Sequence, residues 1–392
     1  MLLPLILDVL LLLAIVAAVA RGASRGLIST AGSTLGAIAG AIIAFLLLPL
    51  ITEWVPLPEW RTPAVFLVLA LLIGGGLTVG ERLGTAGRRS VPKRARPLDR
   101  LGGALAGGVV ALLVMSLLGS TVTALGIPLA SPTTASSTVL RTIDRFTPVP
   151  VARALGQVRG LVVAEGIPRI ADAFGATAPP PPPTVDAATP ALQAAATRVG
   201  RITGAAYACG QVQSGTAFVI GEDRLLTNAH VVQGVTEPTV ELPGLGGRAG
   251  RVVYFDAQQD VAVIAVDGLG IEPLALTATQ PAGTVGAVQG YPYGGPFVSG
   301  GAEVVDAGVI LADDITGSSR APRETYTLAA DVNPGNSGGP VLTLDGAVMG
   351  MVFARSESTD DVGYAHTMAE LDPVIASSGE LSAPVATGNC QG

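Results

Sequence analysis

The sequence of 392 residues predicts two domains of different fold class: an N-terminal all-α membrane domain of four helices and a C-terminal all-β domain of two six-stranded barrels. Hydrophobic residues make up 49% and charged residues 14% of the chain, and the apolar bias lies mainly before residue 125. Farther along, short alternating strands are separated by glycine and proline turns. We expect a membrane domain at 1–126, a stalk at 127–197 and an outer domain at 198–392.

Four apolar segments are each long enough to cross a hydrocarbon layer of about 30 Å as helices. They are residues 2–20, 27–51, 63–80 and 101–125. Arginines flank the first turn and seven cationic residues crowd the third connection, which places both on the cytoplasmic side. An even number of spans then puts both termini outside. We expect a multi-pass protein of the cell membrane, in contact with lipid, with its outer domain extracytoplasmic.

Glycines recur at helical spacing in these segments. Gly32, Gly36 and Gly40 fall four apart, as do Gly103 and Gly107, which permits helices to pack closely. Packing within one bundle is favoured, and dimerisation is the alternative. The four-span segment resembles the colicin V production (CvpA) family in size, glycine content and hydropathy.

The stalk combines a predicted amphipathic stretch at 137–174, interrupted by prolines, with five consecutive prolines at 179–183. The proline run predicts an extended polyproline helix that holds the outer domain away from the bilayer. Because such a segment is exposed, it is also where we expect proteolytic release of the outer domain.

The most specific pattern surrounds one serine, Ser337, in the segment 333–340, Asn-Pro-Gly-Asn-Ser-Gly-Gly-Pro. A serine hydroxyl becomes a good nucleophile only beside a base, and its product oxyanion needs backbone N–H donors. The glycines let the main chain turn tightly and approach a substrate carbonyl. Ser337 is therefore the predicted nucleophile.

The other two members of a catalytic triad follow from a short list of candidates. The chain has two histidines, of which His230 ends a strand pattern and is the candidate base, while His366 is expected to be a core histidine. Asp260 directly precedes a buried strand and would orient the His230 ring. Asp256 and Asp267 are the competing carboxylates. This chemistry needs neither a metal nor an organic cofactor.

Four strings in this order resemble the HtrA/DegP-type and related trypsin-like serine proteases: residues 214–219, 227–232, 260–264 and 335–340. The resemblance implies a chymotrypsin-like double β-barrel with an oxyanion hole made by the backbone N–H groups of Gly335 and Ser337. It also implies a specificity pocket formed by Asp331, Phe353, Ala354 and Arg355, with a solvated loop carboxylate or a structural hydrogen-bond acceptor as the alternative for Asp331. Ala217 replaces the usual glycine of that family, and no PDZ-sized segment follows, so PDZ-gated behaviour is not expected.

The two cysteines, Cys209 and Cys390, lie near the beginning and the end of the outer domain. In an oxidising compartment they can form a disulfide that closes nearly the whole domain into a loop. Two free buried thiols are the alternative. After residue 183 the chain carries 22 acidic residues against eight arginines, which argues against nucleic-acid binding.

The full arrangement resembles the MarP-like family of actinobacterial membrane-anchored periplasmic serine proteases. That resemblance implies a serine endopeptidase that acts on envelope proteins, peptidoglycan hydrolases among them, during acid and oxidative stress. Autocleavage in the linker is a separate hypothesis, which rests on the exposure of that segment. One alternative is a membrane transport or secretion module with a non-catalytic, peptide-sensing outer domain. Another is a peptide-binding pseudoenzyme.

Overall fold

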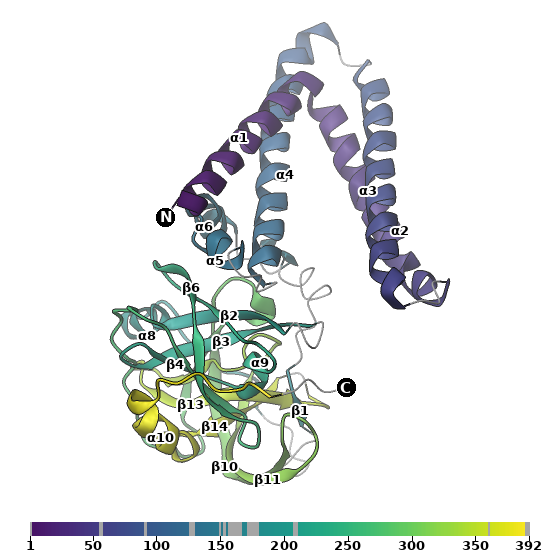
Figure 1. The fold of residues 1–392 in the computed structure, drawn as a ribbon. Coiled ribbons are helices and arrows are strands. Elements are labelled where there is room, and N and C mark those ends of the chain that lie inside the picture. The colour runs from purple at the N-terminus through teal and green to yellow at the C-terminus, as the bar shows by residue number, and fades with distance from the viewer. Residues whose placement is uncertain are drawn as a thin grey trace. The chain divides into compact units, whose positions relative to one another are not determined.

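The structure is a computed structural model (Figure 1), and it describes ten stretches of the chain. They are residues 2–54, 58–89, 92–124, 130–148, 150–151, 154–155, 167–170, 180–206, 211–359 and 361–388. The chain divides into two compact units, Ile6–Ser116 and a second that joins Met1–Leu5 to Leu117–Gly392. Cys209, Cys390, the first proline of the run at 179–183 and 18 of the 38 residues of the expected amphipathic stretch lie outside the described residues.

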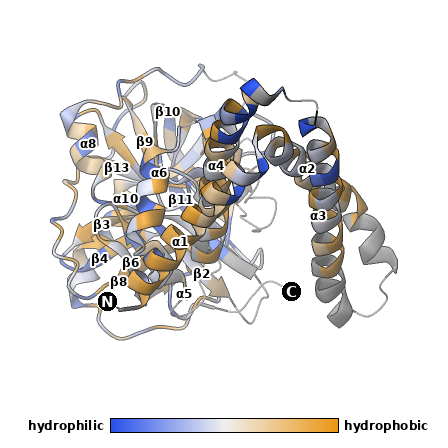
Figure 2. Ribbon diagram, turned by 90° about the horizontal axis from the view of Figure 1, so that it is seen from above, coloured by the Kyte–Doolittle hydropathy of each residue, from blue (hydrophilic) through white to orange (hydrophobic). Residues whose placement is uncertain are grey.

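The first unit is built from four helices, α1 (Leu2–Arg25), α2 (Leu27–Trp54), α3 (Pro58–Arg88) and α4 (Arg96–Ala124). In the described part, three segments are long and apolar enough to cross a membrane: Leu3–Arg25, Leu27–Ala44 and Arg96–Val122. Figure 2 shows hydrophobic residues along α1 and α4. The prediction of apolar N-terminal helices is therefore confirmed, and α3 contains the expected span at 63–80.

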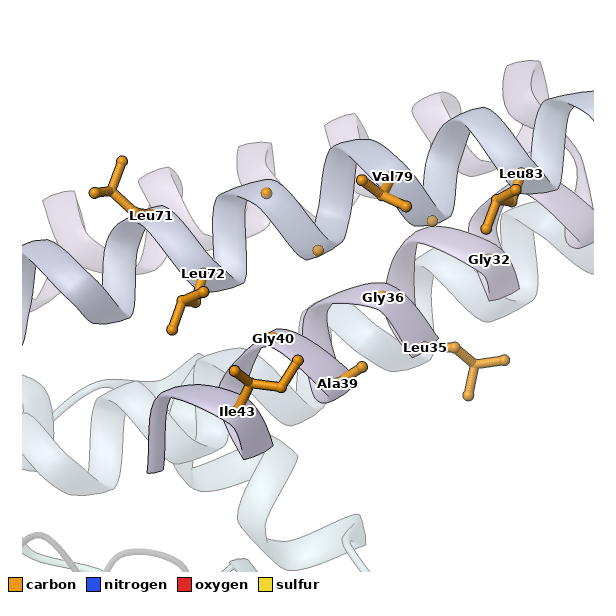
Figure 3. Close-up of a pocket in the computed structure, with 13 residues that line it drawn as sticks. Gly32, Leu35, Gly36, Ala39, Gly40, Ile43, Leu71, Leu72, Val79 and Leu83 are labelled. Atoms are coloured by element: carbon orange, nitrogen blue, oxygen red, sulfur yellow. The ribbon is translucent and has the colours of Figure 1, made fainter. Parts of the chain in front are cut away.

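Helices α2 and α3 pack against each other through their glycines (Figure 3). A Cβ atom added to Gly36 would lie 2.1 Å from the carbonyl oxygen of Gly76, and one added to Gly80 would lie 2.1 Å from that of Gly32. Helices α1 and α4 approach in the same way, since a Cβ on Gly22 would meet the Gly103 oxygen at 2.1 Å. Both glycine series thus serve packing within one bundle.

One ion pair connects all four helices near their turns. Asp99 of α4 is 8% exposed; its Oδ2 atom accepts a hydrogen bond from Arg88 Nε of α3 at 2.9 Å, and its Oδ1 atom accepts one from the Ile28 N–H of α2 at 3.3 Å. Arg88 also donates to the Ser24 carbonyl of α1 at 2.9 Å. The side chain of Asp99 closes over Gly26, where φ is +79° between α1 and α2. This ionic contact satisfies buried polar groups at the meeting point of the helices.

The second unit contains two seven-stranded sheets. The first has the order β6-β5-β2-β3-β4-β8-β7, and the second the order β1-β13-β12-β9-β10-β11-β14. An additional pairing of β13 with β14 closes six strands of the second sheet into a ring. This arrangement confirms an all-β C-terminal domain.

The strands are β1 (Arg169–Ile170), β2 (Val199–Ala206), β3 (Gln211–Gly221), β4 (Arg224–Thr227), β5 (Thr239–Leu242), β6 (Gly246–Ala249), β7 (Arg251–Asp256), β8 (Val261–Ala265), β9 (Val285–Gly290), β10 (Val298–Asp313), β11 (Arg320–Ala330), β12 (Pro340–Thr343), β13 (Val348–Ser356) and β14 (Val362–Thr367). The helices of this unit are α5 (Ala130–Ala135), α6 (Thr138–Phe146), α8 (Pro190–Ala196), α9 (Ala229–Val232) and α10 (Met368–Ser377), with short 3-10 turns at Pro292–Gly294 and Ser378–Glu380.

One apolar core joins the two sheets. It contains Phe218 and Leu226 of the first sheet with Leu342 and Met351 of the second. Leu192 of α8 belongs to the same core and is 1% exposed. The packed part of the domain therefore begins upstream of residue 198, inside the segment that composition alone marks as stalk.

The glycine contact between α2 and α3 can be tested by replacing Gly36 with leucine. The added side chain meets backbone rather than a movable side chain, so we expect a loss of about 1–3 kcal/mol of bundle stability. The matched control is Gly74→Leu, because a Cβ at Gly74 has no atom within 4 Å. Thermal unfolding of the full chain in detergent measures both; equal losses would contradict the packing account.

Candidate active site

His230 lies in the short helix α9, directly after strand β4. Asn228 begins this helix in an extended conformation, and its Nδ2 atom donates to the Asp260 carbonyl at 2.9 Å. The His230 side chain is 12% exposed. The fixed end of β4 and the bond from Asn228 together set the direction of the imidazole ring.

Asp260 binds both the imidazole ring and the backbone of His230. Its Oδ2 atom lies 2.7 Å from His230 Nδ1, and its Oδ1 atom accepts the His230 backbone N–H at 2.9 Å. Asp260 ends the turn between β7 and β8 with a φ of +56° and is 1% exposed. Burial by itself would raise the pKa of this carboxyl group, but the interactions with His230 and the charge of Arg323 lower the pKa below its usual value. Asp260 is therefore ionised and holds the Nδ1 proton of His230.

The two competing carboxylates have other roles. Asp256 Oδ1 accepts the backbone N–H groups of Gln258 and Gln259 at 2.8 and 2.9 Å, which shapes the turn that presents Asp260. Asp267 forms a two-pronged ion pair with Arg251 at the surface, at 2.7 and 2.8 Å. Neither of them contacts the imidazole of His230 in the described structure.

Ser337 sits in the loop between β11 and β12 and is 2% exposed. Two flanking glycines have left-handed backbone angles, with a φ of +93° at Gly335 and +80° at Gly338. A Cβ on Gly338 would lie 2.1 Å from the Thr216 carbonyl and 3.2 Å from the Asn228 nitrogen. Only glycine fits at this position, and its close contact brings Ser337 next to the segment that carries His230.

The chemically important atoms around Ser337 are free in the described structure. Ser337 Oγ and His230 Nε2 are both buried, and neither makes a hydrogen bond to a described residue. No described acceptor receives the backbone N–H of Gly335 or Ser337. Catalytic hydrogen bonds of this kind commonly form only when substrate binds. The site thus contains a hydroxyl, a basic ring nitrogen and two N–H donors without competing partners.

Thr216 of β3 organises the serine loop, a role that the sequence did not reveal. It is fully buried, and its Oγ1 atom donates to the Gly335 carbonyl at 2.7 Å and accepts the Tyr291 N–H at 3.1 Å. Its backbone N–H donates to the Ser337 carbonyl at 2.8 Å, and its own carbonyl accepts Thr227 Oγ1 at 2.7 Å. The string 214–219 signalled the family, but the contact spans 119 residues and follows only from the fold.

The expected specificity residues differ in their exposure and in their contacts. Asp331 is exposed and its Oδ1 atom accepts a hydrogen bond from Asn333 Nδ2 at 2.7 Å. Phe353 and Ala354 are 1% and 0% exposed and belong to a core cluster, so their side chains face the interior. Arg355 uses its backbone N–H to bond Pro168. A role for these four residues in substrate selection stays a prediction.

Phe353 instead forms a buried stack with two basic residues. Its ring lies 4.4 Å from that of His366, at an interplanar angle of 28°, and the Arg323 guanidinium carbon is 4.9 Å from its centre. Arg323 also donates to the Gln258 carbonyl at 2.6 Å. Burial lowers the pKa of His366 to about 3, and the charge of Arg323 acts in the same direction. His366 is therefore a neutral core residue, as expected.

Thr216→Val should disorder the serine loop, because it removes the hydroxyl that bonds Gly335 and Tyr291. A misplacement of about 1 Å at a reacting group costs about 100-fold in rate, so we expect a loss of that order in kcat/KM. Thr216→Ser is the control, since it keeps the hydroxyl and should keep most of the activity. Peptide hydrolysis by both variants makes the comparison; equal losses would exclude the hydrogen bonds as the cause.

His366 should make the domain sensitive to acid. Its folded pKa is about 3 and its unfolded pKa is about 6.5, so only the unfolded chain takes up a proton between these values. The free energy of unfolding should therefore fall with pH from about 6.5 toward about 3, by up to about 1.4 kcal/mol per pH unit. His366→Phe should lose this contribution. Melting temperatures at pH 7 and pH 5 measure it; the same drop in both proteins would refute it.

Two protein families match this chain over separate regions. The trypsin-like peptidase domain matches residues 215–351, and the colicin V production protein matches residues 7–148. Serine protease Rv3671c of Mycobacterium tuberculosis is 35% identical over 263 residues, which is 65% of this chain and 65% of that protein. A probable periplasmic DegP-like serine endoprotease of Halomonas elongata is 37% identical over 161 residues, 38% of this chain and 32% of that protein.

A solved protease structure is similar to this chain over more than half of its length. The crystal structure of the active form of the Rv3671c protease matches with a TM-score of 0.52 and 35% identity, covering 56% of this chain and 99% of that chain. The fold is therefore that of the chymotrypsin- and HtrA-like proteases. Because nearly the whole of that protease is covered at this identity, the chain belongs to the family of serine proteases that contains Rv3671c, with an N-terminal domain of the colicin V production type.

Proposed function

We propose that this protein is a membrane-anchored serine endopeptidase in which His230, Asp260 and Ser337 form the catalytic triad. The observation that carries the proposal is the 2.7 Å contact between His230 Nδ1 and Asp260 Oδ2, which leaves Nε2 as the unprotonated nitrogen. That nitrogen takes the proton of Ser337 Oγ as the oxygen attacks the scissile carbonyl, and Asp260 stabilises the imidazolium that forms.

The backbone N–H groups of Gly335 and Ser337 act as the oxyanion hole. Their freedom from other acceptors supports this role, since preorganised donors stabilise the developing negative charge without reorganisation. His230 then returns the proton to the leaving amine, an acyl-enzyme forms on Ser337, and water hydrolyses it by the reverse sequence.

In the finer architecture that we propose, α1 to α4 cross the cell membrane four times and the two sheets form two barrels. The cationic connection after α3 then lies in the cytoplasm, and both termini and the catalytic domain lie outside. The domains are 1–126, 127–197 and 198–392, with α8 of the linker packed on the catalytic domain. A disulfide between Cys209 and Cys390 closes that domain.

The substrates that we propose are proteins of the cell envelope, peptidoglycan hydrolases among them, together with the protein's own linker. The work of the enzyme is done during acid or oxidative stress. Resemblance to the MarP-like family is the ground for the envelope substrates and the stress role, and the exposed, proline-rich sequence of the linker is the ground for its cleavage.

Labelling with a fluorescent fluorophosphonate tests the mechanism, because the reagent reacts only with an activated serine. We expect the full chain to be labelled, Ser337→Ala and His230→Ala to lose labelling entirely, and Asp260→Asn to be slowed by about 10⁴-fold. Thr343→Ala, in the strand after the serine loop, is the control and should label normally. An unlabelled, folded wild-type chain would contradict the proposal.

A further inference from the structure

Strand β13 forms backbone hydrogen bonds with the two glycines that directly follow Ser337. Its residue Val352 exchanges two bonds with the serine loop: the Gly338 N–H donates to the Val352 carbonyl at 2.8 Å, and the Val352 N–H donates to the Gly339 carbonyl at 2.9 Å. The opposite edge of β13 is paired with β14, from Gly350 to Arg355. The edge that continues beyond Val352 is therefore the one along which an extended peptide can lead to Ser337.

That edge is filled by the protein's own linker. Strand β1 pairs with β13 in parallel, with Arg169 opposite Arg355 and Ile170 opposite Ser356. The Arg355 N–H donates to the Pro168 carbonyl at 3.0 Å, and the Glu357 N–H donates to the Ile170 carbonyl at 3.1 Å. Backbone bonds of this kind are how extended peptides add to an exposed sheet edge.

Apolar side chains fix the linker segment on both sides of these bonds. Ile167 is 7% exposed and belongs to the core cluster that contains Val352 and Met349. Ile170 packs against the neighbouring cluster that contains Phe353 and Tyr364. The segment 167–170 is thus bound as a ligand would be, by two backbone acceptors and two apolar anchors three residues apart.

We propose that the edge of β13 from Arg355 to Glu357 is a strand-addition site for an extended peptide with two apolar residues three apart, and that segment 167–170 is its intramolecular occupant. The inference rests on the proposed function, because it makes the linker a competitor of protein substrates at the same catalytic site. A tethered occupant competes at a high effective concentration, so substrates bind only to the fraction of molecules in which the linker has left.

The first test removes the occupant from the full chain in detergent. The replacements are Ile167→Gly, Pro168→Ser, Arg169→Gly and Ile170→Ser, which keep the linker length. If the edge is occupied about nine-tenths of the time, KM for a peptide substrate should fall about tenfold while kcat stays unchanged. Phe146→Ser, an exposed apolar residue of the same linker, is the control and should leave KM as it is. An unchanged or raised KM in the fourfold variant would overturn the inference.

A single replacement, Ile170→Asn, keeps Ile167 in the core and guards against a folding defect in the fourfold variant. It should also lower KM, by a smaller factor than the fourfold variant does. A fall in kcat without a change in KM would mean that the segment only supports the fold, and would also overturn the inference.

The second test measures binding without catalysis, in chains that carry Ser337→Ala. A fluorescent peptide with the sequence of residues 165–172, Glu-Gly-Ile-Pro-Arg-Ile-Ala-Asp, should bind the fourfold variant and not the chain with its own linker, and a scrambled peptide should bind neither. Absence of specific binding alongside normal fluorophosphonate labelling of chains with Ser337 rejects the strand-addition site and leaves the proposed function intact. Specific binding without such labelling has the opposite meaning: it supports the site and rejects the proposed chemistry.

Discussion

The bonds made by Thr216 are the constraint on which the catalytic geometry depends. Thr216 lies in the first sheet and Ser337 in a loop of the second, so its hydrogen bonds hold the loop with the nucleophile against the sheet that leads to the base. Its backbone N–H and its hydroxyl bond the serine loop and the neighbouring Tyr291, and its carbonyl accepts Thr227 of the strand that leads to His230. Such a fully satisfied buried network fixes one arrangement, because every departure leaves a polar group unpaired.

The helices of the membrane domain are held in contact by a different physical interaction. Without water to drive apolar association, its helices approach through glycine backbones, and the buried pair of Arg88 and Asp99 fixes where they meet. The prediction of four apolar segments required only composition, and the glycine spacing predicted close packing. Which residue each glycine packs against could be identified only from the structure. No pattern in the sequence indicated that Asp99 bonds residues of two other helices.

Some residues of the candidate site could be predicted from the local sequence, and others depend on contacts between residues far apart in the chain. Ser337, His230 and Asp260 could be predicted because each lies in a short string whose chemistry is readable on its own. Thr216 lay in such a string, but its task depends on a loop 119 residues away. Phe353 is predicted to line a pocket, and that role stays a prediction; the structure shows its side chain 1% exposed, in a core cluster. The pairing of β13 with β14 shifts its register between Val352 and Ala354. A shift of one residue turns a side chain to the other face of the sheet, so strand alternation alone does not give the direction of the Phe353 side chain. The linker helix α8 was missed because an alanine-rich sequence hides one anchoring leucine, Leu192.

The division of the site between two sheets also sets when it can exist. Synthesis proceeds from the N-terminus, so the membrane helices and the short helix α9 with His230 are made long before Ser337. The ring of strands under Ser337 closes only when β14, at Val362–Thr367, pairs with β11 and β13. A nascent chain therefore has no assembled nucleophile until β14 has been made, and peptide hydrolysis cannot begin while the strands before β14 are being synthesised.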